Sequence, residues 1–269
     1  MRNLLRRIFS GIVYILIFIS SILFSKESYI ILITIFGFLC IWEFSRMIKL
    51  KNYASYLVFG LLLFLMIQRQ DSLAVTGILA ITIGSSLFLI YQLFAKKEIK
   101  FSNERAKLGI SIRYVLFSVC FLVLLPLREC DFHEGNFHPY LMISILSIIW
   151  VNDSFAFLIG KNFGKHKLFP SVSPKKTVEG FFGGLVFSLL AGLLISKYNV
   201  DFSMISWLVM AVIVSTIGTL GDLVESKFKR HAKVKDSGNI MPGHGGILDR
   251  LDSLLFAAPF VYLYINFII

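Results

Sequence analysis

A polar block at 221–253 carries acidic and basic side chains at spacings that could support phosphate chemistry. On a helix, Asp222 and Glu225 would share one face, and Asp249 and Asp252 repeat the same spacing. Mg²⁺ is usually held by one or two carboxylates together with phosphate oxygens, while Lys and Arg balance the remaining negative charge during phosphoryl-type transfer. The block, which reads GDLVESKFKRHAKVKDSGNIMPGHGGILDRLDS, therefore predicts a site for a phosphate–magnesium complex.

Two other interpretations of this block are weaker. In one, it is a connector whose aspartates and lysines only pair with each other. In the other, His231 and His244 bind zinc, but no Cys or second ligand pair has the required spacing. Residues 242–246 (PGHGG) are too rich in glycine for a helix, and they predict a tight turn where the backbone closely approaches another group.

A second polar loop, at 160–180, reads GKNFGKHKLFPSVSPKKTVEG. Its first part is not a P-loop, because Gly160 and Gly164 are separated by three residues rather than four. Its second part, SPKKTVEG, places two lysines and two hydroxyl side chains near the expected start of a helix, whose N-terminus attracts phosphate. It predicts a phosphate-binding segment, with a short polar helix cap as the alternative. The residues concerned are Ser173, Lys175, Lys176 and Thr177.

Two further acidic residues fall within long apolar segments, where a carboxylate is costly unless it is paired or functional. Glu43 lies three residues before Arg46, so a local ion pair on one helical turn is expected. Asp153 has no cation one turn away. It is either hydrogen-bonded to a neighbouring helix or part of the lining of a polar cavity.

The elements that must position these groups are membrane-spanning helices. The chain has 269 residues, of which 57% are hydrophobic, with 27 Phe and a mean hydropathy of +0.78. A spanning helix needs about 20 mostly apolar residues, and the segments lack the period-two alternation of a membrane barrel. We therefore expect an all-α, polytopic transmembrane protein with about nine spans, at 8–25, 28–48, 53–68, 72–95, 110–127, 138–160, 178–196, 203–222 and 253–269.

Charge predicts the orientation of these spans. If the N-terminus is cytoplasmic, most Lys and Arg fall on cytoplasmic loops, as the positive-inside rule requires. This places both polar loops in the cytoplasm and accounts for most of the net charge of +11. We expect a single membrane domain at 1–269, with N-terminal spans at 1–135 and the catalytic spans and loops at 136–269.

The polar block also resembles a known family signature. Its order and spacing are similar to those of the CDP-diacylglycerol synthase (phosphatidate cytidylyltransferase) family, and SPKKTVEG and the Asn152-Asp153 pair fit that family as well. The resemblance covers about 150–255. Met241, Phe155 and Val178 depart from the family pattern without removing a charged group. The residues that carry the signature are Ser226, Phe228, Lys229, Arg230, Lys235, Asp236, Gly238, Pro242, Gly243, His244, Gly245, Gly246, Asp249, Arg250 and Asp252.

The resemblance implies transfer of CMP from CTP to phosphatidate, giving CDP-diacylglycerol and pyrophosphate. It implies Mg²⁺ bound by Asp222 and Asp249, leaves room for a second cation, and suggests a homodimer. The catalytic residues would be Asp222, Asp249, Lys229, Arg230, Lys235 and Arg250, the four basic side chains neutralising phosphate charge. Substrate would contact Ser173, Lys175, Lys176, Thr177, Asp153, Asp236, Gly243, His244, Gly245 and Gly246.

The resemblance further implies an integral protein of a bacterial inner membrane, in contact with membrane lipids and with its site facing the cytoplasm. No nucleic acid is expected as a partner. One alternative is a cytidylyltransferase for a different lipid phosphate. Another is an ion-coupled transporter that uses Asp153 and Asp222 as cation sites, although the polar residues gather in one half of the chain rather than in two repeated halves. A CDP-alcohol phosphotransferase is disfavoured, because its D-G-x₂-A-R pattern does not occur.

Overall fold

The computed structural model describes residues 2–51, 53–70, 72–95, 101, 103–127, 137–199 and 201–269, with side chains from Phe9 onward. The N-terminal arginine side chains and residues 96–100, which contribute to the charge asymmetry, lie outside the described residues. Every predicted site residue lies within them.

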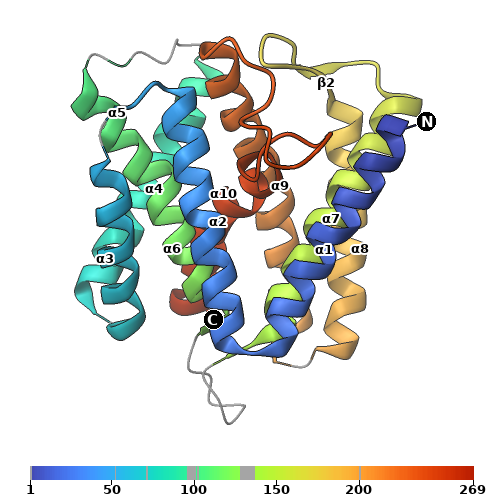
Figure 1. The fold of residues 1–269 in the computed structure, drawn as a ribbon. Coiled ribbons are helices and arrows are strands. Elements are labelled where there is room, and N and C mark those ends of the chain that lie inside the picture. Colours follow the sequence, from blue (N-terminus) through green and yellow to red (C-terminus); the bar gives the residue numbers. More distant parts are fainter. Residues whose placement is uncertain are drawn as a thin grey trace.

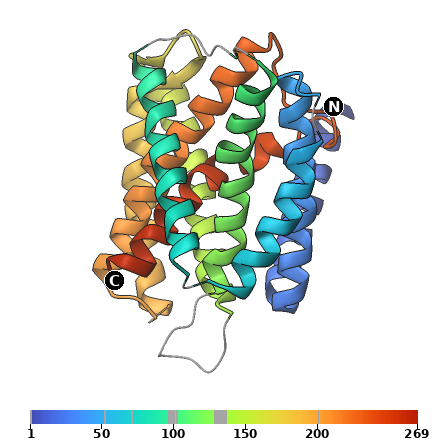
Figure 2. The same ribbon diagram turned by 90° about the vertical axis from the view of Figure 1, so that its left-hand side faces the viewer.

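Most of the described residues are helical, and most of the helices run side by side along a common direction (Figures 1 and 2). The C-terminal helix, red in Figure 2, crosses the bundle obliquely. The first four are α1 (Arg2–Phe24), α2 (Lys26–Met47), α3 (Ala54–Gln68) and α4 (Leu73–Phe94). A continuous rod follows, made of α5 (Glu104–Ile110), a π-helical segment η1 (Ser111–Leu116), α6 (Phe117–Leu124) and a short η2 (Leu125–Leu127). The C-terminal half contains α7 (Pro139–Phe163), β1 (Lys167–Phe169), β2 (Ser173–Thr177), α8 (Val178–Tyr198), α9 (Met204–His231) and α10 (Leu248–Phe267).

Each predicted span coincides with a helix or with the 104–127 rod. Six of these are long and apolar enough to cross a membrane, within the part of the chain that the structure describes. Helices α1 and α3 contribute shorter apolar stretches, Phe9–Phe24 and Ala54–Gln68. The all-α membrane class is therefore confirmed, while nine crossings and a cytoplasmic N-terminus stay predictions.

Two helix ends in the structure differ from the predicted ones, and both lie in the polar block. Helix α9 continues to His231, beyond the predicted end at 222, and α10 begins at Leu248 rather than at 253. Most of the charged residues in the block are therefore helical, and only 232–247 connects the two helices. The hydrophobicity that sets a span does not set where a helix ends, since the end depends on local capping.

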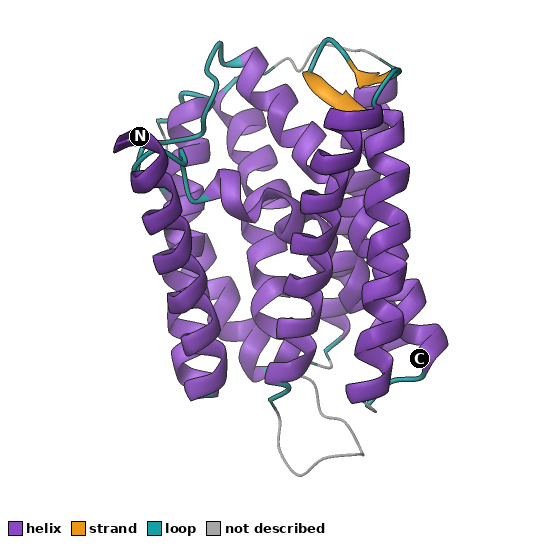
Figure 3. Ribbon diagram, turned by 90° about the vertical axis from the view of Figure 1, so that its right-hand side faces the viewer, coloured by secondary structure: helices purple, strands orange, loops and turns teal. Residues whose placement is uncertain are grey.

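All strands of the described residues lie at one end of the bundle (Figure 3). β1 and β2 pair antiparallel, with Lys167 opposite Thr177 and Phe169 opposite Ser173. Thr177 then caps α8, its hydroxyl accepting a hydrogen bond from Gly180 N at 3.1 Å. The predicted helix start after SPKKT is confirmed, and the hairpin leads directly into it.

The N-terminus lies at the same end as β2, and the C-terminus lies at the opposite end (Figure 1). The 232–247 segment descends from the end of α9 into the bundle, so α10 starts below the level of the hairpin (Figure 1). Close packing between α9 and α10 supports this arrangement, because a Cβ on Gly221 would lie 2.9 Å from Phe256 Cγ. Small residues at helix contacts allow backbones to approach closely in membrane proteins. Helix α10 therefore packs closely against α9 at Gly221 and Phe256.

Candidate active site

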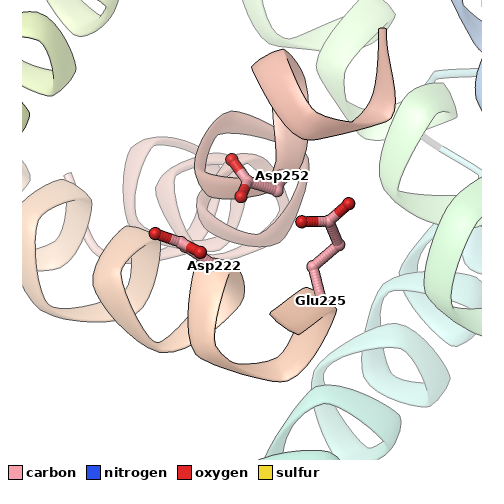
Figure 4. A group of neighbouring side chains, drawn as sticks. All are labelled: Asp222, Glu225 and Asp252. Carbon is pink, nitrogen blue, oxygen red and sulfur yellow. The ribbon is translucent and has the colours of Figure 1, made fainter. Parts of the chain in front are cut away.

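Three carboxylates converge where α9 and α10 meet. Asp222 and Glu225 come from α9 and Asp252 from α10, and Figure 4 shows them pointing toward one another. One oxygen from each lies within 4.8 Å of the other two. Glu225 is fully buried, and its Oε1 has no hydrogen-bond partner among the described residues. Three hard oxygen donors with an unpartnered buried oxygen fit a magnesium ion, which prefers such ligands.

Lys229 connects this cluster to Asp249. Its ammonium lies 2.5 Å from Glu225 Oε2, one turn back on α9, and 2.7 Å from Asp249 Oδ1 on α10. The other Asp249 oxygen accepts hydrogen bonds from Ser237 N at 2.9 Å and Gly246 N at 2.8 Å. Lys229, predicted to neutralise substrate phosphate, therefore neutralises two carboxylates of the protein itself. Asp249 is next to the cluster but is held by a cation and two amides.

The hairpin adds a second cation. Lys176 on β2 pairs with Asp222 on α9, with 2.7 Å between Nζ and Oδ2. Ser226 Oγ, one turn further along α9, donates to the other Asp222 oxygen at 3.2 Å. Lys175, the neighbour of Lys176 on the strand, is exposed, because successive strand residues point to opposite faces. The ion pair between Lys176 and Asp222 thus joins the two polar segments, and Lys175 does not take part in it.

Glu43 does not form the predicted pair with Arg46. The Arg46 guanidinium instead lies over the Trp42 ring, 4.6 Å from its centroid. Glu43 is fully buried and accepts hydrogen bonds from Ile247 N and Leu248 N at the start of α10. The prediction is wrong because a local helix pair is worth only about 0.2–0.5 kcal/mol. Leaving the buried backbone N–H groups of Ile247 and Leu248 without an acceptor would cost more, about 1–3 kcal/mol for each group.

Residues 242–246 form the predicted tight turn. Met241 N donates to Gly245 O at 2.9 Å and His244 N donates to Met241 O at 3.0 Å. Gly243 and Gly245 have φ values of 79° and 93°, which side chains disfavour. A Cβ on Gly245 would lie 2.5 Å from Asp249 Oδ2. The backbone of this turn therefore approaches a carboxylate of the protein itself.

The ring of His244 contacts the N-terminal helix. Its Nδ1 lies 2.7 Å from Ser10 Oγ on α1, and Ser10 Oγ also donates to Pro242 O at 3.1 Å. Arg250 is exposed at the start of α10 and donates from Nη2 to His244 O at 3.0 Å. These bonds shape the turn and dock α1 against it.

Asp153 lies on α7 and is exposed in the isolated chain. Asn152 Nδ2 donates to its Oδ1 at 3.3 Å, and the charges of Lys176 and Asp222 act on it. The exposure of Asp153 disfavours the first interpretation from the sequence, and the lining of a polar cavity stays a prediction. A hydrogen bond to a neighbouring helix is not found for Asp153 among the described residues.

Several predicted site residues make no hydrogen bond or ion pair to the carboxylates within the described part of the chain. Arg230 is exposed and donates to Val172 O at 3.3 Å, which ties the hairpin loop to the end of α9. Ser173 is part of the same hairpin and is half-buried. Lys235 and Asp236 are exposed on the 232–247 segment.

The sequence left two buried acids without a role in the site. Glu225 shares the Asp222 face of α9 at the i+3 spacing, so the helical periodicity contained the signal for it. For Glu43 no local spacing could have given the role, because its partners are about 200 residues away along the chain.

Comparison with known proteins identifies relatives across the whole chain. Residues 5–268 match the model of a family described as the cytidylyltransferase family. A protein of Bacillus subtilis (strain 168) named phosphatidate cytidylyltransferase is 37% identical over 269 residues, which cover 97% of each chain. A protein of the same name from Staphylococcus haemolyticus is 34% identical and covers 94% of this chain and 95% of its own. Another from Staphylococcus saprophyticus is 44% identical over 177 residues, 65% of this chain and 64% of its own.

Proposed function

The chain belongs to the cytidylyltransferase family, and on that premise we propose that it transfers CMP from CTP to phosphatidate, producing CDP-diacylglycerol and pyrophosphate. The observation that carries the proposal is the cluster of Asp222, Glu225 and Asp252 with Lys176 and Lys229 bound to its members. Carboxylates and ammonium groups alternate there over a few ångströms. Such a site suits two anionic phosphate substrates and a divalent cation better than a site of carboxylates alone or of ammonium groups alone.

The reaction needs no nucleophile from the protein. A phosphate oxygen of phosphatidate forms a bond to the α-phosphorus of CTP, and the bond from that phosphorus to the bridging oxygen breaks. Pyrophosphate leaves with the electron pair of the broken bond. The task of the chain is therefore to hold two mutually repelling anions in line and to balance their charge.

We propose that Asp222 and Asp249 would hold a magnesium ion, with Glu225 and Asp252 beside it. Asp249 would act from its place next to the cluster, where Lys229 and two backbone amides hold its carboxylate. The bound ion would neutralise phosphate oxygens and so stabilise the charge that develops on the leaving group. Lys176 on the hairpin, which pairs with Asp222, would bind phosphate there, and Arg250, which is exposed at the start of α10, would neutralise phosphate charge. Lys229 holds Glu225 and Asp249 at a fixed separation.

The remaining parts of the proposal concern location. CTP is a soluble cytoplasmic nucleotide, so the end of the bundle with the hairpin and the 232–247 segment would face the cytoplasm of a bacterial inner membrane. Phosphatidate would reach the site from the surrounding lipid, no nucleic acid is involved, and the working form would be a homodimer. Maleimide labelling of Lys175→Cys with an impermeant reagent, in a chain that also carries Cys130→Ser, tests the orientation. Inverted vesicles should label and intact cells should not.

The deciding experiment supplies purified protein with labelled CTP, phosphatidate and Mg²⁺. CDP-diacylglycerol and pyrophosphate should appear in equal amounts. Absence of both products from protein shown to be folded contradicts the proposal. Preferential use of another lipid phosphate in the same assay would instead support the alternative acceptor.

A further inference from the structure

Glu43 on α2 reaches the polar block from the N-terminal half of the chain. Its Oε1 accepts a hydrogen bond from Ile247 N at 3.1 Å, and its Oε2 accepts one from Leu248 N at 2.8 Å. The side chain is fully buried. Both oxygens of a carboxylate are thus committed to the backbone where α10 begins.

The start of α10 needs such a partner. The first backbone N–H groups of a helix have no acceptor within the helix, and the N-terminus carries a partial positive charge. Ile247 occupies the capping position and supplies no side-chain hydrogen bond. A carboxylate from α2 therefore performs the capping that α10 does not provide for itself.

Glu43 also holds the segment that leads into α10. Ser237 Oγ donates to Glu43 Oε2 at 3.1 Å, while Ser237 N donates to Asp249 Oδ2 at 2.9 Å. A Cβ on Gly238 would lie 2.7 Å from Glu43 Cδ, and one on Gly246 would lie 2.5 Å from Glu43 Oε1. The backbone of the segment is therefore packed directly against this carboxylate at both ends.

The residues that depend on this cap include two carboxylates of the site. Asp249 follows Leu248 immediately, and Asp252 lies one turn further along α10. The Asp249 carboxylate also bonds to Gly246 N, the amide next to those held by Glu43. Any shift in the first turn of α10 would move Asp249 and Asp252 relative to Asp222 and Glu225 on α9.

We propose that Glu43 is a positioning residue for the transfer reaction: its carboxylate fixes the first turn of α10 and thereby sets where Asp249 and Asp252 stand against the acidic residues of α9. The inference rests on the proposed function. Glu43 does not touch the reacting atoms, and its effect passes through the two aspartates.

The experiment compares Glu43→Gln, Glu43→Asp and Glu43→Ala with the full-length wild type in detergent. Glu27→Gln is the matched control, because Glu27 lies at the other end of α2 and is exposed. For each protein, kcat, KM for CTP and phosphatidate, and the Mg²⁺ concentration for half-maximal rate are measured per folded molecule. Hydrogen–deuterium exchange over 237–248 gives a readout that does not depend on activity.

Glu43→Gln should fold, lose about 10²-fold in kcat as expected for misplaced catalytic groups, and need several-fold more Mg²⁺. KM for phosphatidate should stay within about two-fold, since the contacts that Glu43 makes are to the first turn of α10 and its approach. Exchange at 237–248 should accelerate, and Glu43→Asp should recover part of the rate because it restores the charge. Glu27→Gln should match the wild type in every measurement.

Equal kcat and equal Mg²⁺ dependence in the wild type and Glu43→Gln would overturn the inference. So would a loss of rate that is fully explained by a smaller folded fraction, because a purely structural role predicts that result. If Glu43→Ala does not fold, the Gln and Asp variants decide. An inactive but folded wild type would count against the proposed function, whereas an active wild type with indifferent Glu43 variants would count against the inference alone.

Discussion

Lys229 on α9 bonds to Asp249 on α10, with 2.7 Å between Nζ and Oδ1. The same ammonium holds Glu225 at 2.5 Å, and the side chains of all three residues are almost fully buried. A buried ion pair adds little net stability, but removing one partner leaves an uncompensated charge. Lys229 therefore both joins the two helices that form the site and permits two acidic residues to stand beside each other.

Replacing Lys229 with Met should destabilise the protein strongly. Glu225 and Asp249 would lose their common cation, at a cost of about 3–5 kcal/mol. Chemical unfolding in detergent, followed by near-UV circular dichroism, measures the loss. Lys227→Met is the matched control, because Lys227 is half-buried and donates to the Gln92 carbonyl oxygen at 2.8 Å, a hydrogen bond worth about 1 kcal/mol. Equal effects of the two substitutions would contradict the role given to Lys229.

Replacing Asp249 with Asn should stop turnover while the protein stays folded. The substitution is nearly isosteric, and Lys229 keeps its bond to Glu225. We expect kcat to fall by at least about 10²-fold, the scale seen when a group that stabilises transition-state charge is removed. The assay is product formation from labelled CTP, with Asp201→Asn, near the opposite end of the bundle, as the control. A variant that retains most of its activity would refute the assignment of Asp249 to the metal.

Removing divalent cations with EDTA should abolish activity, and added Mg²⁺ should restore it. Asp252→Asn should then raise the Mg²⁺ concentration for half-maximal rate by about ten-fold or more, because the carboxylates near a metal tune its affinity. Titration of the rate with Mg²⁺ gives the comparison. An unchanged half-maximal concentration would exclude Asp252 from the metal environment and leave Asp222 and Asp249 as the proposed ligands.

The two hairpin lysines should differ sharply. Lys176→Ala removes the cation that bonds to Asp222 at 2.7 Å, and kcat should fall by about 10²-fold or more. Lys175→Ala removes an exposed cation on the other face of the strand, and the rate should change by no more than a few-fold. Both variants are compared at saturating CTP and phosphatidate. A larger effect at Lys175 would show that the hairpin presents its opposite face to substrate.

Gly246 should not tolerate a side chain. A Cβ there would press on Ser237 Oγ and the Glu43 carboxylate, so Gly246→Ala should displace the first turn of α10 and lower kcat by about 10²-fold. Gly84→Ala on α4 is the control, because no described residue outside its own stretch of helix lies within 4 Å of the added carbon and alanine favours a helix. Activity and thermal unfolding are measured for both. Similar outcomes would mean that the segment before α10 has room to adjust.

The sequence by itself determined the class of the protein and most of the helices. Apolar segments of about 20 residues must become helices in a membrane, because no other open structure satisfies their backbone groups there. It also determined that Asp222 and Glu225 share a face, since that follows from helical periodicity alone. The turn at 242–246 was equally predictable, because its glycines adopt backbone angles that other residues disfavour.

Only the tertiary structure decided which partner each charged side chain bonds to. Lys176 and Lys175 are adjacent and chemically identical, yet only Lys176 bonds to Asp222, because the direction of the strand selects one of them. Lys229 bonds to protein carboxylates rather than standing open to substrate. Glu43 caps a helix about 200 residues away instead of pairing with Arg46. Partners at that separation are set by how the helices pack, and the spacing of residues along one helix carries no information about the next.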